Sequence, residues 1–331
     1  MNYRTALLLV ISSLLTTACQ PEQQAFQSTE RWRITSEPVV DAKLSQQGDY
    51  AALLLASNSL ELWHNASKQK VARWETEQIN ANTFLLELSA SAEYLLTANK
   101  KQIQVWHVES NTALGGLDFS QHLGDAQITQ IRFSQAPQRF IVGSSRGEVI
   151  FADIESNTYR TNQSHTGEVT KLLVSVNRQR LFSGANDGRV VVWDMVNYQP
   201  ITIKALPHRI TSLATDGNGR VFISDALKDH IVWDSQRDSD IGELSFFKNF
   251  TWFRESLFYP ERSWLITSSP KTDVYLWDSQ QLVELHSWAI ESHGLGSAME
   301  DMKPMPQSYL RTLSSDGVLQ DWDLSSIEAS L

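Results

Sequence analysis

The segment HTGEVTKLLVSVNRQRLFSGANDGRVVVWD, which spans residues 165–194, decides the fold. It contains three β-rich apolar runs, separated first by residues 177–179 and then by residues 186–188. The Asn-Asp-Gly sequence of the second break predicts a tight hairpin turn, because Asn and Gly tolerate the positive φ that such a turn requires. The third run ends in Trp193 and Asp194. One unit of this kind cannot bury its own sheet faces, so the segment predicts further copies of itself.

Strand ends centred on Trp recur along the chain, at Trp63, Trp106, Trp193, Trp233, Trp277 and Trp322. The interval between the second and third of these is twice the others, and VIFAD (149–153) lies in its middle with Ala152 at the Trp position. The steps are then 43, 46, 41, 40, 44 and 45 residues. The chain therefore contains seven repeats of short β-rich runs, which favours an all-β fold.

These repeats resemble the WD40-repeat family, and the similarity covers nearly all of residues 30–331. It is strong in the fourth repeat and weak in the third. The resemblance implies a seven-bladed β-propeller. We expect its blades at residues 38–75, 82–120, 127–163, 168–206, 209–247, 252–289, and 297–324 together with 30–36.

The last repeat has no room for an outermost strand, because only residues 324–331 follow Asp323. Residues 31–35 (RWRIT) are similar to residues 71–75 (VARWE), the predicted outermost strand of the first blade. We therefore expect this N-terminal strand to complete the last blade and close the ring, which leaves no open sheet face between the first and last blades.

Residues 1–18 form a separate region with the pattern of a signal peptide: Arg4, an apolar run over residues 6–15, and small residues at 16–18. Cys19 follows, and it is the single cysteine of the chain. This arrangement resembles a bacterial lipobox, although Thr16 stands where that motif usually has Leu. Lipidation of Cys19 is the expectation; secretion with a free Cys19, or an uncleaved anchor, is the alternative. The polar residues 19–29 predict a flexible tether.

The expected location follows from this leader. The lipobox resemblance, with Gln20 after the cysteine, predicts a lipid-anchored protein of the cell envelope, in the outer membrane and facing the periplasm. The chain carries a formal net charge of −10, which disfavours nucleic acid as a partner. Contact with the membrane is expected through the lipid on Cys19.

The fourth repeat contains a Ser, a His and an Asp, which invite comparison with a catalytic triad. In WD40 proteins the matching positions form a structural hydrogen-bond chain, so the resemblance assigns a structural tetrad to His165, Ser183, Asp187 and Trp193. Parts of it recur elsewhere, with His208, Ser224 and Trp233 in the fifth repeat and Asp229 one residue out of step. Repetition over several blades favours a structural role over one active site.

Other signs of chemistry are missing from the sequence. It has no HExxH motif, no Gly-rich phosphate loop and no nucleophile elbow, and the eight His are not paired at metal-ligand spacing. We therefore predict no enzymatic activity, no catalytic residue, no metal and no cofactor.

Propellers generally present a partner surface at the mouth, where the innermost strand of each blade begins. The seven predicted starts are Pro38, Thr83, Gln127, Glu168, Arg209, Trp252 and Ala298. Trp252 stands out among them, with Arg254 beside it and Arg209 and Glu168 at the starts of the two preceding blades. Trp and Arg are favoured anchors of protein interfaces. Packing of Trp252 inside blades five and six, with Phe246, is the alternative. We expect a protein-binding scaffold, with a small-ligand binder or hydrolytic enzyme using the central channel as the second hypothesis.

Overall fold

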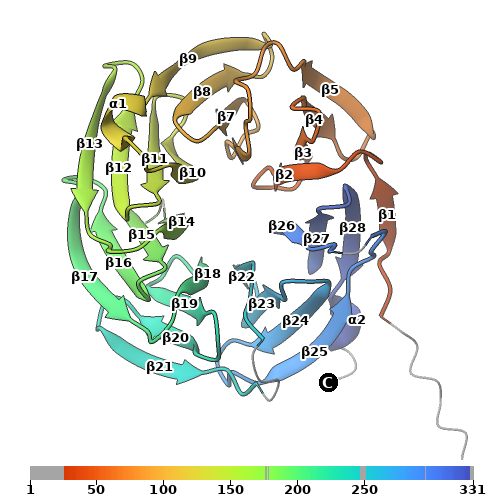
Figure 1. Cartoon of the computed structure of the whole chain (residues 1–331). Coiled ribbons are helices and arrows are strands. Elements are labelled where there is room, and N and C mark those ends of the chain that lie inside the picture. The colour runs from red at the N-terminus through yellow and green to blue at the C-terminus, as the bar shows by residue number, and fades with distance from the viewer. Residues whose placement is uncertain (1–25, 176, 178, 247–250, 295, 329–331) are drawn as a thin grey trace, which may run out of the picture.

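A computed structural model describes residues 26–175, 177, 179–246, 251–294 and 296–328. The predicted signal peptide, Cys19 and most of the tether lie outside these residues. Within them, the strands form seven four-stranded antiparallel sheets arranged around a ring, as Figure 1 shows. The prediction of an all-β, seven-bladed propeller is confirmed.

The predicted blade boundaries agree with the observed strands to within a few residues. Blades 1 to 4 consist of β2 (Val39–Leu44), β3 (Tyr50–Leu55), β4 (Leu60–His64), β5 (Gln69–Trp74); β6 (Leu85–Leu88), β7 (Tyr94–Ala98), β8 (Gln102–His107), β9 (Thr112–Asp118); β10 (Ile128–Gln135), β11 (Arg139–Ser144), β12 (Glu148–Asp153), β13 (Thr158–Gln163); and β14 (Val169–Ser175), β15 (Arg180–Ala185), β16 (Arg189–Asp194), β17 (Gln199–Ala205). Blades 5 to 7 consist of β18 (Ile210–Thr215), β19 (Arg220–Asp225), β20 (His230–Asp234), β21 (Ser239–Glu243); β22 (Ser256–Tyr259), β23 (Trp264–Ser268), β24 (Asp273–Asp278), β25 (Glu284–Ala289); and β26 (Met299–Met305), β27 (Tyr309–Ser314), β28 (Val318–Asp323) with β1 (Glu30–Arg33).

The tight turn of blade 4 forms where the sequence places it, between β15 and β16. Gly188 has φ +78°, in the left-handed region that favours glycine. A Cβ atom there would lie 2.3 Å from the carbonyl oxygen of Leu206. The turn therefore needs glycine for both its backbone conformation and its close contact with the chain beside it.

The seventh blade joins the two ends of the described chain. β1 pairs antiparallel with β28, with Glu30 opposite Asp321 and Arg33 opposite Val318. Trp32 of β1 also lies 5.5 Å, ring to ring, from Trp63 of blade 1. The N-terminal strand thus occupies the outermost position of blade 7 (Figure 1), and it also contacts blade 1.

The core lies between adjacent blades rather than within any one of them. Trp193 of blade 4 is fully buried against Ile141 and Phe151 of blade 3. Ala152, at the Trp position of the third repeat, is also buried and packs in a cluster with Phe119 and Phe140. Side chains from other positions, one of them in the segment that follows blade 2, therefore pack in this cluster beside Ala152.

The two helices, α1 (Ser120–Leu123) and α2 (Ser325–Glu328), are single turns. In the part of the chain that the structure describes, no helix has the length and apolar character needed to cross a membrane.

Candidate functional site

The blade 4 network has the geometry of a buried structural chain. The Trp193 Nε1–H donates to Ser183 Oγ at 2.9 Å, and Ser183 Oγ shares a 2.8 Å hydrogen bond with His165 Nε2. His165 Nδ1 lies 3.3 Å from Asp187 Oδ1. Burial lowers the pKa of His165 and outweighs the opposing effect of Asp187. Because Ser183 is fully buried, its hydroxyl has no approach for a substrate.

The network of blade 5 differs from the expected one. Ser224 Oγ bonds to His230 Nδ1 at 3.0 Å, whereas His208 is exposed. Trp233 Nε1 donates to Asp238 at 3.2 Å instead of to the strand Ser. The assignment of His208 was wrong: His230, the first residue of β20, makes the hydrogen bond to Ser224 that His165 makes to Ser183 in blade 4.

The other Trp residues at the repeat position find different acceptors for their indole N–H groups. Trp106, Trp277 and Trp322 donate to a Thr hydroxyl on the neighbouring strand, at 2.9 to 3.0 Å. Trp63 donates to Glu61 at 2.9 Å. At the repeat position of each blade that has a Trp, the indole N–H thus finds an acceptor, and Thr, Ser or a carboxylate can supply it.

The mouth of the propeller is the face where the innermost strands begin. Six of these strands begin one or two residues after the predicted positions, but β22 begins at Ser256, four residues after Trp252. Trp252 therefore lies in the segment that leads into β22. It is half-buried, with the Arg209 guanidinium 5.9 Å from its ring.

A cavity of about 340 Å³, which we name the mouth cavity, opens at this face. Trp252, Arg209 and Arg254 all line it. Glu168 is half-buried and is not among the lining residues. The structure thus brings together three of the four partner-binding candidates. Of the packing alternative, Phe246 packs against the cluster that contains the fully buried Phe253, whereas Trp252 itself is half-buried.

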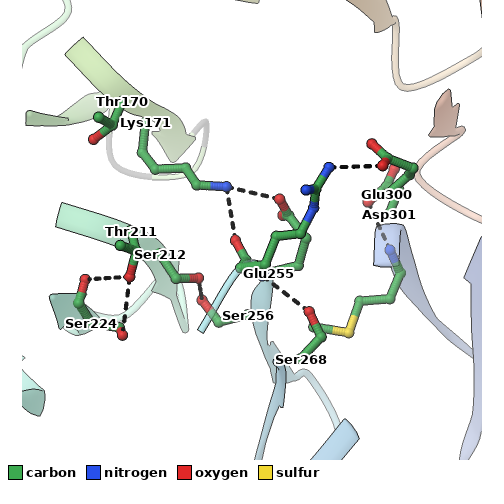
Figure 2. Close-up of polar contacts among 12 residues, drawn as sticks. Thr170, Lys171, Thr211, Ser212, Ser224, Glu255, Ser256, Ser268, Glu300 and Asp301 are labelled. Carbon is green, nitrogen blue, oxygen red and sulfur yellow. Dashed lines mark hydrogen bonds and ion pairs between the residues drawn. The ribbon is translucent and has the colours of Figure 1, made fainter. Parts of the chain in front are cut away.

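The wall of the channel below the mouth carries ion pairs that link different blades. Lys171 Nζ lies 2.8 Å from Glu255 Oε1, and Figure 2 shows its side chain reaching from β14 toward that carboxylate. Arg254 pairs with Glu300 at 2.7 Å. Arg132 pairs with a glutamate of blade 2, Glu87, at 2.9 Å.

Two aspartates of the channel accept backbone hydrogen bonds as well as ion pairs. Asp41 pairs with Lys43 at 2.8 Å and accepts from the backbone N–H of Leu86 at 2.8 Å. Asp301 pairs with Lys303 at 2.9 Å and accepts from the backbone N–H of Leu44 at 2.9 Å. Each aspartate therefore joins the innermost strand of its own blade to that of the next.

The carboxyl groups of the channel differ in their acidity. Burial raises the pKa of Glu300 to about 7, although Arg254 opposes the change. Burial also raises the pKa of Glu87, with Arg132 acting against it. For Glu255, burial would raise the pKa, but Lys171 and Lys43 hold it below its ordinary value. The charge of Glu300 therefore changes near neutral pH.

A second, larger cavity of about 990 Å³ opens at the opposite face, where the innermost strands end and turn into the second strands. We name it the turn-side cavity. Four residues line both cavities and form the waist between them: Lys43, Arg132, Glu255 and Glu300. Among the described residues, no group of three or more His, Cys, Asp or Glu is arranged to hold a metal ion.

The two cavities differ in charge. The mouth cavity is lined by five cationic and three carboxylate side chains, a formal charge of +2. The turn-side cavity is lined by three cationic and six carboxylate side chains, a formal charge of −3. The two ends of the channel are therefore suited to ligands of opposite charge.

Sequence reasoning missed these channel residues, although a signal was present. Asp41, Lys171, Glu255 and Asp301 all lie three residues after the predicted start of an innermost strand. Lys43, Arg132 and Lys303 lie five residues after it. Alternate residues of a strand face the same side, so charges at the third and fifth positions of the innermost strands predict a charged channel.

Comparison with known proteins agrees with the fold. Residues 156–194, which include most of blade 4, match the family described as WD domain, G-beta repeat. The structure and this match together define a seven-bladed β-propeller that carries a WD40 repeat.

The chain is also similar to several WD-repeat and related proteins. It is 29% identical over 109 residues to cilia- and flagella-associated protein 52 of Macaca fascicularis, a match that covers 32% of this chain and 17% of the relative. It is 30% identical over 116 residues to WD repeat and FYVE domain-containing protein 2 of Homo sapiens, covering 34% and 27%. It is 29% identical over 156 residues to guanine nucleotide-binding protein subunit beta of Nicotiana tabacum, covering 43% and 41%. The matched region spans less than half the length of each relative.

Proposed function

We propose that this chain is a non-enzymatic protein-binding scaffold, displayed on a lipid-anchored β-propeller in the bacterial cell envelope. Its partner would be another envelope protein. The ring holds the loops of seven blades in fixed relative positions, so a partner meets a preformed surface. Preformed surfaces bind with a smaller loss of conformational freedom than mobile ones.

The observation that carries this proposal is the arrangement of Trp252, Arg209 and Arg254 at the mouth cavity. Trp and Arg are the residues most enriched among those that dominate binding energy at protein interfaces. Trp252 is half-buried, so one part of its ring is held by the protein while the rest is available to a partner.

The location is supported by the sequence of the N-terminal region. The signal-peptide pattern of residues 1–18 and the following Cys19 favour lipidation in the envelope, in the outer membrane and facing the periplasm. An extended tether over residues 20–29 reaches at most ~35 Å. The propeller would then stay close to the membrane that anchors it.

The test is crosslinking in cells that carry the full-length protein, followed by co-purification, with Trp252→Ala compared to wild type. Tyr159→Ala is the matched control, because Tyr159 is an aromatic residue that is 41% exposed on the outer strand β13, away from the mouth. We expect a discrete envelope protein that is recovered with wild type and with the control but lost with Trp252→Ala. Recovery from all three would move the contact away from the mouth, and no specific partner from any of them would contradict the scaffold role.

The second candidate function is small-ligand binding in the central channel. It is favoured by the charged side chains that converge on the waist, among them Glu255 and Glu300 from different blades. Charged groups fixed in a concave site orient a small ligand and select it by charge.

A further inference from the structure

We propose that the turn-side cavity binds a small organic ammonium ion, with the charged nitrogen at the waist and the apolar part of the ligand against the cavity wall. This inference rests on the second candidate function, ligand binding in the channel. It does not depend on the scaffold role, because the site lies at the end of the channel opposite the mouth.

The size and wall of the cavity fit a small organic molecule. Its volume of about 990 Å³ is at the upper end of the range typical of ligand pockets, ~300–1,000 Å³. The wall includes Leu88, Phe133, Leu173, Tyr259 and Met305, which come from five different blades. An apolar ligand body would gain free energy by leaving water for this surface.

The charge of the cavity selects a cation. Its three cations are already paired with carboxylates: Lys43 with Asp41, Arg132 with Glu87, and Lys303 with Asp301. An anion would have to compete with those partners.

The carboxylates of the cavity are less completely paired than its cations. At the rim, Asp49 and Glu261 are exposed and form no ion pair with the described residues. At the waist, Glu300 uses Oε1 for Arg254, and no hydrogen bond to a described residue is seen for Oε2. A positively charged ligand would therefore meet unpaired carboxylates at the entrance, and at the bottom a carboxylate whose Oε1 is paired with Arg254 and whose Oε2 has no hydrogen bond to a described residue.

The surroundings of Glu300 would favour an additional positive charge near its carboxyl group. Its side chain is only 10% exposed, and burial raises its pKa to about 7. The charged groups that act on it are Arg254 and Lys43, which favour the carboxylate, and Asp41, which disfavours it. The cations that the protein supplies do not offset the burial. A ligand cation nearby would lower this pKa, so binding at neutral pH would release protons.

The test is isothermal titration calorimetry of the full-length protein with phenethylamine, which stays protonated at neutral pH. Two probes have a similar apolar body with a different charge: 3-phenylpropionate is anionic and 2-phenylethanol is neutral. We expect the amine to bind at least about tenfold more tightly than either, a difference of ~1.4 kcal/mol. Titrations in buffers with different ionisation enthalpies should show proton release on amine binding at pH 7, because burial raises the pKa of Glu300 to about 7 and a bound cation would lower it.

Two sets of variants separate this site from the mouth. Glu300→Gln keeps an oxygen for Arg254 but removes the titrating carboxyl, and it should abolish the proton release and weaken the amine several-fold. Asp49→Asn with Glu261→Gln changes only exposed rim residues, so it should fold normally and still weaken binding. Trp252→Ala, at the mouth, should leave amine binding unchanged.

Equal binding of the amine and the alcohol would overturn the proposal, because the cavity would then recognise only the apolar body. Amine binding that neither variant set weakens would place the ligand elsewhere and also overturn it. Absence of amine binding at millimolar concentration would exclude the site as stated. None of these results bears on partner recovery in the crosslinking experiment, so the two hypotheses fail separately.

Discussion

Replacement of Ser183 by Ala tests whether the Ser, His and Asp of blade 4 hold the fold. Ser183 is fully buried, and its hydroxyl accepts from Trp193 at 2.9 Å and bonds with His165 at 2.8 Å. The substitution removes one oxygen atom and leaves both partners buried without that contact. A buried polar group without a partner costs ~1–3 kcal/mol. We therefore expect Ser183→Ala to lower the free energy of unfolding by about 2–6 kcal/mol, the sum for the two groups.

The measurement is urea unfolding followed by Trp fluorescence. Ser156→Ala is the matched control, because the Ser156 hydroxyl is exposed and, among the described residues, bonds only to that of Thr158, at 2.7 Å. The control should change the free energy of unfolding by no more than ~0.5 kcal/mol. If Ser183→Ala has the same free energy of unfolding as Ser156→Ala, the network does not stabilise the blade. If it keeps full stability and loses a hydrolytic activity, the triad hypothesis gains the support that the structural one loses.

The remaining predictions concern acid stability and ring closure. Burial lowers the pKa of His230 from 6.5 to about 4, so its stabilising contribution is present above pH 6.5 and is lost as the pH falls through about 4. The stability lost in this way amounts to ~3 kcal/mol. In wild type, the urea midpoint should fall over this pH range, and in His230→Gln it should change less with pH. Deletion of β1 (Glu30–Arg33) leaves the edge of β28 open, so we expect a lower Tm and self-association by light scattering. A truncated protein that stays monomeric with an unchanged Tm would show that closure by β1 is dispensable.

The fold could be predicted from the sequence because each blade repeats the same local signals. The turn at Gly188 and the buried Trp193 belong to one segment of thirty residues, and the structure places both as expected. The hydrogen-bond networks of the other blades were harder to predict from the sequence. Ser224 has two histidines near it in sequence, His208 and His230, and only the three-dimensional path of the chain decides which one it meets.

The channel could not be predicted in the same way, because it is a property of the whole ring. The carboxylate of Glu87 meets Arg132, which lies 45 residues away, and that of Glu255 meets Lys171, which lies 84 residues away. No window of one repeat contains both members of either pair. The sequence could show that the innermost strands carry charges, but their pairing required the positions of all blades.

The position of a residue within a blade also explains where function can differ between repeats. Trp193 and Trp277 occupy equivalent sites, and both must fill the space between blades and satisfy an indole N–H, so their surroundings are similar. The innermost strand faces the channel and is free of that requirement. At the third position after the predicted start, blade 4 has Lys171, blade 5 has Ser212 and blade 6 has Glu255. Self-similarity therefore marks the residues that build the propeller, and its loss along the channel marks the surface that can distinguish one ligand from another.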